Sequence, residues 1–188
     1  MKPVSSREAT ELLREGKVGL VPTETVVGLV AGERGLTRLA GIKGRDPAKP
    51  IALLCLSTEE AFALAARIPP GARALAESFW PGPLTLVLRK ADGKTIGVRV
   101  PSHPTVRELL ADHGTPLYAT SANPSGGAAP STLDGVDPVI GASIDFMMEG
   151  QPGSGEASAV VDLSKGRASI LRPSIGLDET ILSRLTKA

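Results

Sequence analysis

The residues best suited to chemistry are hydroxyls, one amide and fixed cations that follow short apolar runs. The clearest case is "PTET", residues 22–25, which interrupts the apolar run of residues 18–32. Burying an unpaired hydroxyl or carboxylate costs about 1–3 kcal/mol, so a strand meant only to fill a core would not carry these groups. Either the strand ends at Pro22 and the polar groups cap the next element, or they face a ligand.

Other apolar runs lead into similar polar segments. "IKGRDPAKP" follows a helical pattern, Arg99 and Arg172 follow apolar strand patterns, and "PLYA" leads into "TSANPSGG". Ligands of open α/β sheets sit in the crevice beyond the strand ends, so we expect these segments to meet there at one site. Arginine forks match carboxylate and phosphate oxygens, and glycine-rich turns let backbone N–H groups approach an anion. The candidate polar set is Thr23, Thr25, Ser121, Ser125, Ser131, Ser158, Asn123, Lys43, Arg45, Lys49, Arg99 and Arg172.

Several of these segments also have a purely structural interpretation. Thr23 and Thr25 could cap a helix that begins near Val26, the basic residues of 43–49 could form a solvated loop, and "TSANPSG" could be only a turn. An arginine between Val98 and Val100 in a strand is harder to explain structurally and favours a functional role. His103 is expected to begin a helix and His113 to end one.

The same inventory excludes several kinds of site. There is no GxxxxGK[ST] loop and no strand followed by GxGxxG, which argues against a P-loop or a dinucleotide fold. Two histidines and one cysteine are too few for a His/Cys metal site. Cys55 lies in the apolar run "IALLCL", as expected of a buried, inert thiol. The sequence predicts a site that binds an anion and aligns reactants without a nucleophile of its own.

Length and composition predict one ordinary globular domain over residues 1–188. Of the 188 residues, 41% are hydrophobic and 22% are charged, and the formal net charge is +1. That charge argues against a protein that clamps nucleic acid through bulk charge. No run approaches the roughly 20 apolar residues of a membrane span, and the N-terminus has no apolar signal region. We therefore expect a cytoplasmic protein with no membrane contact.

Hydrophobic periodicity predicts alternating helices and strands. Ser5 and Glu8 fit a capping box at the start of the first helix, and "ADGK" fits a hairpin turn. Helices are expected over residues 5–16, 35–44, 58–68, 70–80, 104–114 and 177–187. Strands are expected over 18–22, 51–56, 83–90, 95–101, 116–122 and 144–150, with a hairpin over 158–173 and a loop over 123–132. The pattern predicts an α/β fold: a twisted, mixed parallel and antiparallel sheet flanked by helices.

Taken in order, six segments resemble the signature blocks of the YrdC/Sua5 family of threonylcarbamoyl-adenylate synthases. They are "VPTETVVGLV", "KGRDPAKPIALL", "WPGPLTLVL", "IGVRVPSHP", "ATSANPSG", and "SAVVDLS" followed by "ILRP". The likeness covers roughly residues 4–172 and is that of the short, single-domain form. It implies a YrdC/RibB-like sheet with a large, concave, basic cavity.

The resemblance implies that L-threonine, bicarbonate and ATP, with Mg²⁺, give threonylcarbamoyl-AMP and pyrophosphate. A separate transferase complex would then modify the tRNA adenosine next to the anticodon. One alternative is a non-catalytic module that binds double-stranded RNA or tRNA, whose binding would fall steeply with salt. Another is a carbamoyl transferase of hydrogenase maturation, although those proteins are larger and rich in cysteine.

The resemblance also implies roles for individual residues. L-threonine would be bound by Thr23, Arg99, Ser121 and Ser158, with Arg99 holding its carboxylate bidentately. ATP would be bound by Lys43, Arg45, Lys49, Thr95, Asn123, Ser131 and Arg172. Replacing Arg99 by Ala is expected to raise the threonine KM and leave the fold intact. "NPSGGAAP" or "GQPGSGEAS" would serve as a lid that excludes water.

The chain departs from the family pattern at three positions. Val27 stands where tyrosine is usual, Leu54 where some members have histidine, and Asp46 where many have proline. The first two are expected to alter the threonine pocket. Because a hydrophobic pocket rejects an isostere only weakly, serine is expected to compete better here than in relatives.

Overall fold

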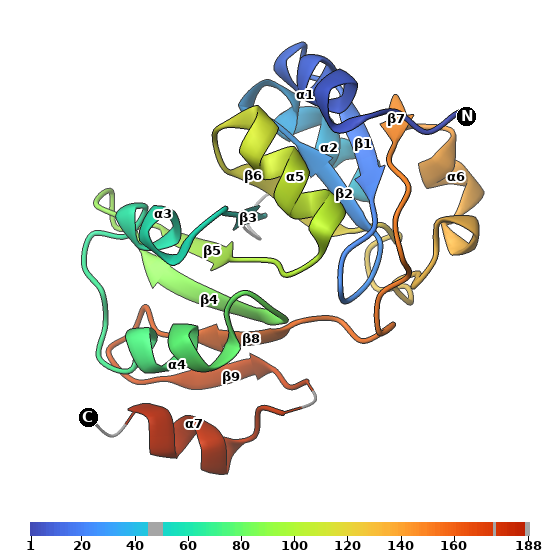
Figure 1. Ribbon diagram of the computed structural model, residues 1–188. Coiled ribbons are helices and arrows are strands. Elements are labelled where there is room, and N and C mark those ends of the chain that lie inside the picture. Colours follow the sequence, from blue (N-terminus) through green and yellow to red (C-terminus); the bar gives the residue numbers. More distant parts are fainter. Residues whose placement is uncertain (45–50, 175, 187–188) are drawn as a thin grey trace.

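One mixed β-sheet runs through the whole fold (Figure 1). The computed structural model describes residues 1–44, 51–174 and 176–186. Within these residues, nine strands lie in the order β7-β1-β2-β6-β3-β5-β4-β8-β9. Three pairs, β1–β7, β3–β5 and β4–β8, are parallel, and the others are antiparallel, so the predicted mixed sheet is confirmed. The strands are β1 (Val18–Val21), β2 (Gly28–Ala31), β3 (Ala52–Leu54), β4 (Leu84–Arg89), β5 (Thr95–Arg99), β6 (Leu117–Ser121), β7 (Phe146–Met147), β8 (Ala159–Asp162) and β9 (Ser169–Arg172).

The described helices flank the sheet and contribute to three apolar clusters of the core. The first turn of α1 carries the predicted capping box, in which Ser5 Oγ accepts the Glu8 N–H and the Glu8 carboxylate accepts the Ser5 N–H. Helix α5 begins with the predicted His103 cap and ends at His113. The helices are α1 (Ser6–Arg14), α2 (Leu36–Lys43), α3 (Thr58–Ala63), α4 (Ala72–Phe79), α5 (Pro104–His113), α6 (Pro138–Gly141) and α7 (Glu179–Thr186), with 3-10 turns η1 (Glu33–Gly35) and η2 (Leu133–Gly135).

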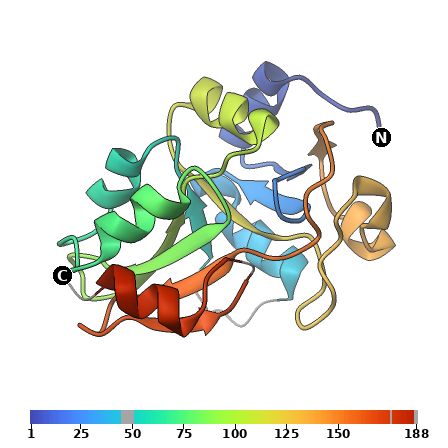
Figure 2. The same ribbon diagram turned by 60° about the horizontal axis from the view of Figure 1, so that its bottom comes forward.

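Two pairs of helices cover different parts of the sheet. Helices α1 and α5 lie together over the β1–β2 end, where Val21 and Val30 share their apolar cluster (Figure 1). Helices α4 (green) and α7 (red) pack side by side against the β4–β8 half (Figure 2). There Leu75 and Leu182 bury their side chains against Leu86 of β4 and its neighbours. Within the described residues, no helix packs extensively against the opposite face of that half.

The apolar run of residues 18–32 folds as a hairpin. Strands β1 and β2 pair from Val18↔Ala31 to Val21↔Gly28, and residues 22–27 form the turn between them. The idea that Thr23 and Thr25 cap a helix near Val26 is wrong, because the chain enters a second strand there. Periodicity did not separate this strand from its polar turn, and it also missed the single-turn helix α6, which is too short for a helical pattern.

In the part of the chain that the structure describes, no helix has both the length and the apolar character needed to cross a membrane.

Candidate active site

A cavity of about 660 Å³ lies on the uncovered face of the sheet and extends from β2 to β9. Strand β4 illustrates the cause: Leu84, Leu86 and Leu88 point into the helical core, whereas Thr85 and Val87 line the cavity. Successive side chains of a strand project to opposite faces, so one strand can serve both. The expectation of a crevice beyond the strand ends is therefore wrong, and the site lies across the sheet itself.

Most of the predicted site residues meet in this cavity. Ser131 does not line it, so its role as a nucleotide contact stays a prediction without geometric support. Arg45 and Lys49, with the departure at Asp46, lie outside the described residues. The predicted residues that line the cavity are Thr23, Thr25, Lys43, Thr95, Arg99, Ser121, Asn123, Ser125, Ser158 and Arg172.

The Thr23–Thr25 turn is tied to strand β5 by a directed chain of hydrogen bonds. Thr23 Oγ1 donates to the Val26 carbonyl at 2.7 Å and lies 2.8 Å from Thr25 Oγ1. Because the single hydroxyl hydrogen of Thr23 is used, Thr25 must donate in that second contact. Arg99 Nη2 in turn donates to Thr25 Oγ1 at 3.1 Å. The hydroxyls thus close a turn, as in the structural interpretation, and also line the cavity.

Arg99 is buried and already holds several partners. Its Nε donates to the Gly82 carbonyl at 3.2 Å, and its Nη2 lies 2.8 Å from Glu24 Oε1. Nη1 makes no hydrogen bond to any of the residues that the structure describes. The open fork expected for a bidentate grip is therefore not present, and Nη1 is the nitrogen left for a ligand.

The electrostatics of this pair keep Glu24 ionised. Burial of the Glu24 carboxyl would raise its pKa. The positive charge of Arg99, together with hydrogen bonds from Arg99 and the Ser102 N–H, outweighs burial and lowers that pKa below its ordinary value. The pair is thus an ion pair at neutral pH.

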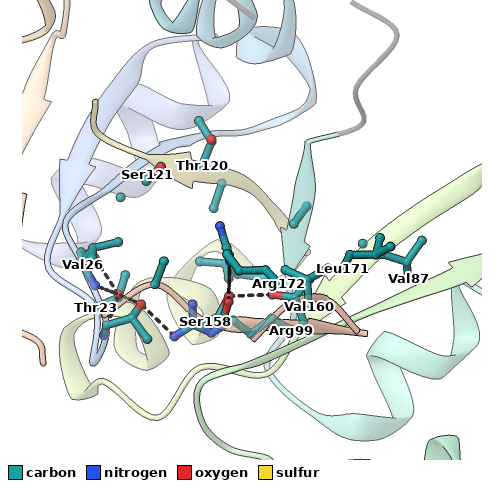
Figure 3. A pocket seen from close by; sticks show the side chains of 18 of the residues that line it. Thr23, Val26, Val87, Arg99, Thr120, Ser121, Ser158, Val160, Leu171 and Arg172 are labelled. Atoms are coloured by element: carbon teal, nitrogen blue, oxygen red, sulfur yellow. Dashed lines mark hydrogen bonds between the residues drawn. The ribbon is translucent and has the colours of Figure 1, made fainter. Parts of the chain in front are cut away.

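Ser158 is the centre of a second cluster (Figure 3). Its Oγ lies 3.0 Å from Thr85 Oγ1 and 3.1 Å from Arg172 Nη2, and its carbonyl accepts from Arg172 Nε at 2.7 Å. These contacts join β4, β9 and the residue just before β8. Thr85 was missed by sequence reasoning, although a hydroxyl among the alternating leucines of "LTLVLR" was a usable signal.

Lys43 is buried and connects α2 to the end of β6. Its Nζ donates to the Ser121 carbonyl at 2.7 Å, to Ser121 Oγ at 3.1 Å and to Asn123 Oδ1 at 2.7 Å. For Lys43 the solvated-loop interpretation is therefore wrong. The "TSAN" segment is likewise more than a turn, since its amide and hydroxyl hold a buried charge.

The far end of the cavity has a different character. Thr95 lies there on β5, and Asp162 of β8 is a buried carboxylate whose Oδ1 accepts both the N–H and the hydroxyl of Ser164. Sequence reasoning missed Asp162. The basic character expected of the cavity stays a prediction. Among the residues that the structure describes, four cations line it, Lys43, Arg99, Lys165 and Arg172, but Glu24 pairs with Arg99, and Lys165 lies 3.9 Å from the Asp162 carboxylate.

Two positions singled out in the sequence differ in their relation to the cavity. Val27 is buried in an apolar cluster with Leu29 and Ile140 and does not line the cavity, so its expected effect on the threonine pocket stays a prediction. Leu54 does line it. Cys55 is fully buried outside the lining, and burial, with a smaller effect of Glu60, raises the pKa of its thiol to about 12. The prediction of an inert thiol is confirmed.

Comparison with known proteins agrees with this fold. The sequence profile of the Sua5/YciO/YrdC family, described as "Telomere recombination", matches residues 11–174. The chain therefore belongs to this family.

Two named relatives and one solved structure are closely similar. The threonylcarbamoyl-AMP synthase of Pyrococcus abyssi (strain GE5 / Orsay) is 36% identical over 180 residues, or 89% of this chain and 53% of that protein. The protein of the same name from Bacillus subtilis (strain 168) is 33% identical over 180 residues, or 88% and 52%. The crystal structure of P. abyssi Sua5 complexed with L-threonine has a TM-score of 0.86 at 34% identity and covers 96% of this chain and 56% of that one. The chain thus spans about half the length of these relatives.

Proposed function

We propose that this chain condenses L-threonine, bicarbonate and ATP into threonylcarbamoyl-AMP and releases pyrophosphate. The observation that carries the proposal is one cavity that joins Arg99, Ser158 and the Thr23–Thr25 turn to Lys43 and Asn123. Its volume of about 660 Å³ falls within the range of roughly 300–1,000 Å³ usual for ligand sites. Membership of the family and the names of the relatives support the same reaction.

The amino acid would bind beside Arg99. Nη1 of Arg99 would hold the carboxylate through one nitrogen, and Ser158, just before β8, would orient the amino acid. The apolar side chain of Leu54 would face the threonine methyl. L-threonine in the P. abyssi neighbour supports an amino-acid ligand here.

ATP would occupy the rest of the cavity. Lys43 and Arg172 would neutralise phosphate oxygens, together with Arg45 and Lys49, and Thr95 and Asn123 would contact the nucleotide. Mg²⁺ would arrive on the triphosphate, where it supplies charge neutralisation, because such ions are commonly held by substrate phosphates and only one or two carboxylates. Among the described residues, no group of three metal-ligating side chains occurs. Asp162 is a carboxylate of the lining, but its Oδ1 accepts two hydrogen bonds from Ser164 and its Oδ2 lies 3.9 Å from Lys165 Nζ, so the triphosphate would hold the ion.

The chemistry needs alignment more than a protein nucleophile. Bicarbonate takes up a proton and loses water to give CO2. The neutral threonine amine adds to the carbon of CO2 and releases a proton, and the product is a carbamate. A carbamate oxygen then attacks the α-phosphorus, a new P–O bond forms, and the bond to the β-phosphate oxygen breaks to release pyrophosphate. In these two reaction steps, no lining residue forms a covalent bond with a reactant.

The product would serve tRNA modification in the cytoplasm. A carbamoyl adenylate is an activated mixed anhydride, so a separate transferase must consume it. We infer that a threonylcarbamoyl transferase complex passes the group to the tRNA adenosine next to the anticodon.

The test is pyrophosphate release from ATP and bicarbonate, with and without L-threonine, followed by mass detection of the adenylate. Threonine-dependent release together with the mass of threonylcarbamoyl-AMP is the expected result. L-serine and L-valine in place of threonine would measure the selectivity of the pocket. No release with any amino acid, together with salt-sensitive tRNA binding, would replace the proposal with the RNA-binding alternative.

A further inference from the structure

Glu24 lies behind Arg99, outside the cavity lining, and makes the ion pair described above. We propose that Glu24 is a positioning residue: it fixes the Arg99 guanidinium so that Nη1 alone faces the amino-acid carboxylate. This inference rests on the proposed function, since it assigns how that same site selects its amino acid.

One carboxylate oxygen of Glu24 contacts both Arg99 and the backbone of Ser102. Glu24 Oε1 lies 2.8 Å from Arg99 Nη2 and accepts the Ser102 N–H at 3.1 Å. Ser102 lies shortly after the end of β5, so the same oxygen is fixed to the backbone of the segment whose side chain it holds. A carboxylate anchored in this way cannot follow the guanidinium if it swings, and therefore defines its place.

The remaining partners of Arg99 complete the arrangement. Nε donates to Gly82, and the two hydrogens of Nη2 go to Glu24 and Thr25. Guanidinium has five N–H donors in a rigid plane, so three fixed contacts leave the two hydrogens of Nη1. The orientation of the whole plane is thereby determined before any ligand binds.

The segment 149–155 packs against the backbone of residues 23–25 and helps to bury the Glu24–Arg99 pair. The Ser154 N–H donates to the Glu24 carbonyl at 3.0 Å, and the Gly155 N–H donates to the Thr25 carbonyl at 2.8 Å. A Cβ atom on Gly153 would lie 2.4 Å from the Thr23 carbonyl oxygen, so only glycine permits this approach. The Glu24 side chain is consequently only 17% exposed and that of Arg99 9%, which strengthens their attraction.

Two effects of Glu24 on threonine binding oppose each other. Its negative charge weakens the attraction of Arg99 for a substrate carboxylate, whereas its fixed position keeps Nη1 directed at that carboxylate. The Ser102 contact decides between them, because a mere counter-ion would need no anchor of its own. We therefore expect loss of Glu24 to weaken threonine binding.

The test compares Glu24→Ala and Glu24→Gln with the wild-type chain. The measurements are the KM values for L-threonine and ATP in pyrophosphate release, direct calorimetric binding of L-threonine, and Tm. Glu24→Ala should raise the threonine KM about tenfold and the ATP KM less than about twofold, since a hydrogen bond to a charged group is lost. Glu24→Gln retains an acceptor oxygen and should raise the threonine KM by about threefold. Because glutamine has nearly the volume of glutamate, Glu24→Gln still provides the test if Glu24→Ala does not fold.

A matched control is Glu33→Gln, which removes a carboxylate that accepts the Tyr118 hydroxyl outside the cavity. Both KM values should stay unchanged in that variant. An unchanged or lowered threonine KM in folded Glu24→Gln would overturn the proposal, and a lowered one would make Glu24 a competitor of the substrate. An equal rise of both KM values with a lowered Tm would mean a purely structural role. A wild-type chain that neither binds threonine nor depends on it would instead overturn the proposed function.

Discussion

The Nζ atom of Lys43 lies 2.7 Å from Oδ1 of Asn123, which joins the last residue of α2 to the segment that follows β6. The two residues are 80 positions apart in the sequence. The ammonium group is buried and also donates to Ser121, so it fixes the wall of the cavity where we place ATP.

Lys43→Met should weaken ATP binding and destabilise the fold moderately. Methionine keeps much of the length but leaves Asn123 Oδ1 and the Ser121 carbonyl without this donor. We expect the ATP KM to rise about tenfold and the free energy of unfolding to fall by about 1–2 kcal/mol. Nucleotide titration and urea unfolding would measure the two effects.

Lys90→Met is the matched control, because Lys90 makes only an exposed contact with Asp92 at 3.5 Å. Such pairs contribute little, so both quantities should match wild type. Equal ATP affinity in the Lys43 and Lys90 variants would remove Lys43 from the nucleotide site.

Arg99→Met should lower stability as well as threonine affinity. The sequence-based expectation of an intact fold overlooks Glu24, which the substitution leaves as a nearly buried, unpaired carboxylate. We expect a loss of about 2–3 kcal/mol in the free energy of unfolding, somewhat below the range for fully buried pairs. Chemical denaturation monitored by circular dichroism would measure it.

The double variant Arg99→Met with Glu24→Gln separates stability from binding. Without a buried charge, most of the lost stability should return, while the threonine KM should stay at least about tenfold above wild type. A double variant as unstable as Arg99→Met would show that the pair is not the source of the loss.

Thr85→Val should affect the amino-acid end of the cavity. The Thr85 hydroxyl is 3.0 Å from Ser158 Oγ, and its loss frees a residue that we place on the substrate. We expect a destabilisation of about 1 kcal/mol and a threonine KM about threefold higher. Unfolding and steady-state kinetics on the same preparation would test both.

Thr10→Val, like Thr85→Val, replaces a buried threonine hydroxyl by a methyl group, but it is expected to stabilise the fold. The Thr10 hydroxyl is buried in α1 and has no hydrogen-bond partner among the described residues. Removing it should raise the free energy of unfolding by about 1 kcal/mol and leave activity unchanged. A destabilised Thr10→Val would contradict the assignment of an unsatisfied hydroxyl.

The Glu24–Arg99 pair also predicts a pH dependence of stability. Burial would raise the pKa of Glu24, but the attraction of Arg99 and the hydrogen bonds outweigh it, so that pKa is below its ordinary value of 4.5 in the folded chain. A depressed folded pKa contributes stability that is present above the unfolded pKa and is lost as pH falls through the folded pKa. Arg99 and the Ser102 N–H are the groups that face this carboxylate.

Urea unfolding at pH 7 and at pH 4 or below would measure this contribution. Wild type should lose more stability on acidification than Glu24→Gln, which has no proton to take up at this position. An identical loss in the two proteins would assign the acid sensitivity to other carboxylates, such as Asp145, which pairs with Arg38.

Local sequence determined most helices and most strands because their signals are local. The Ser5–Glu8 capping box and the alternation of "LTLVLR" are complete within a few residues, and both elements form as predicted. Strand β2 was not separated from its turn, because an apolar run with a polar interruption does not reveal where the chain reverses.

The sequence identified part of the cavity lining but not the contacts between the lining residues. Ten of the predicted polar residues line one cavity, because the ordered family blocks specify residue types at positions that the sheet brings together. Thr85 and Asp162 were missed, since nothing in one strand says which of its two faces will remain uncovered. For the same reason, the sequence did not show that Val26 lines the cavity whereas its neighbour Val27 lies in an apolar cluster.

By itself, therefore, the sequence determined the fold class, the absence of a motif for a protein nucleophile, and which polar residues are available for chemistry. Tertiary structure alone decided that the site lies on a sheet face, that Lys43 is buried, and that Glu24 and Thr25 already occupy part of the Arg99 fork. The physical reason is that these contacts join residues about 75–80 positions apart, and their geometry depends on strand register and twist, which local patterns do not encode.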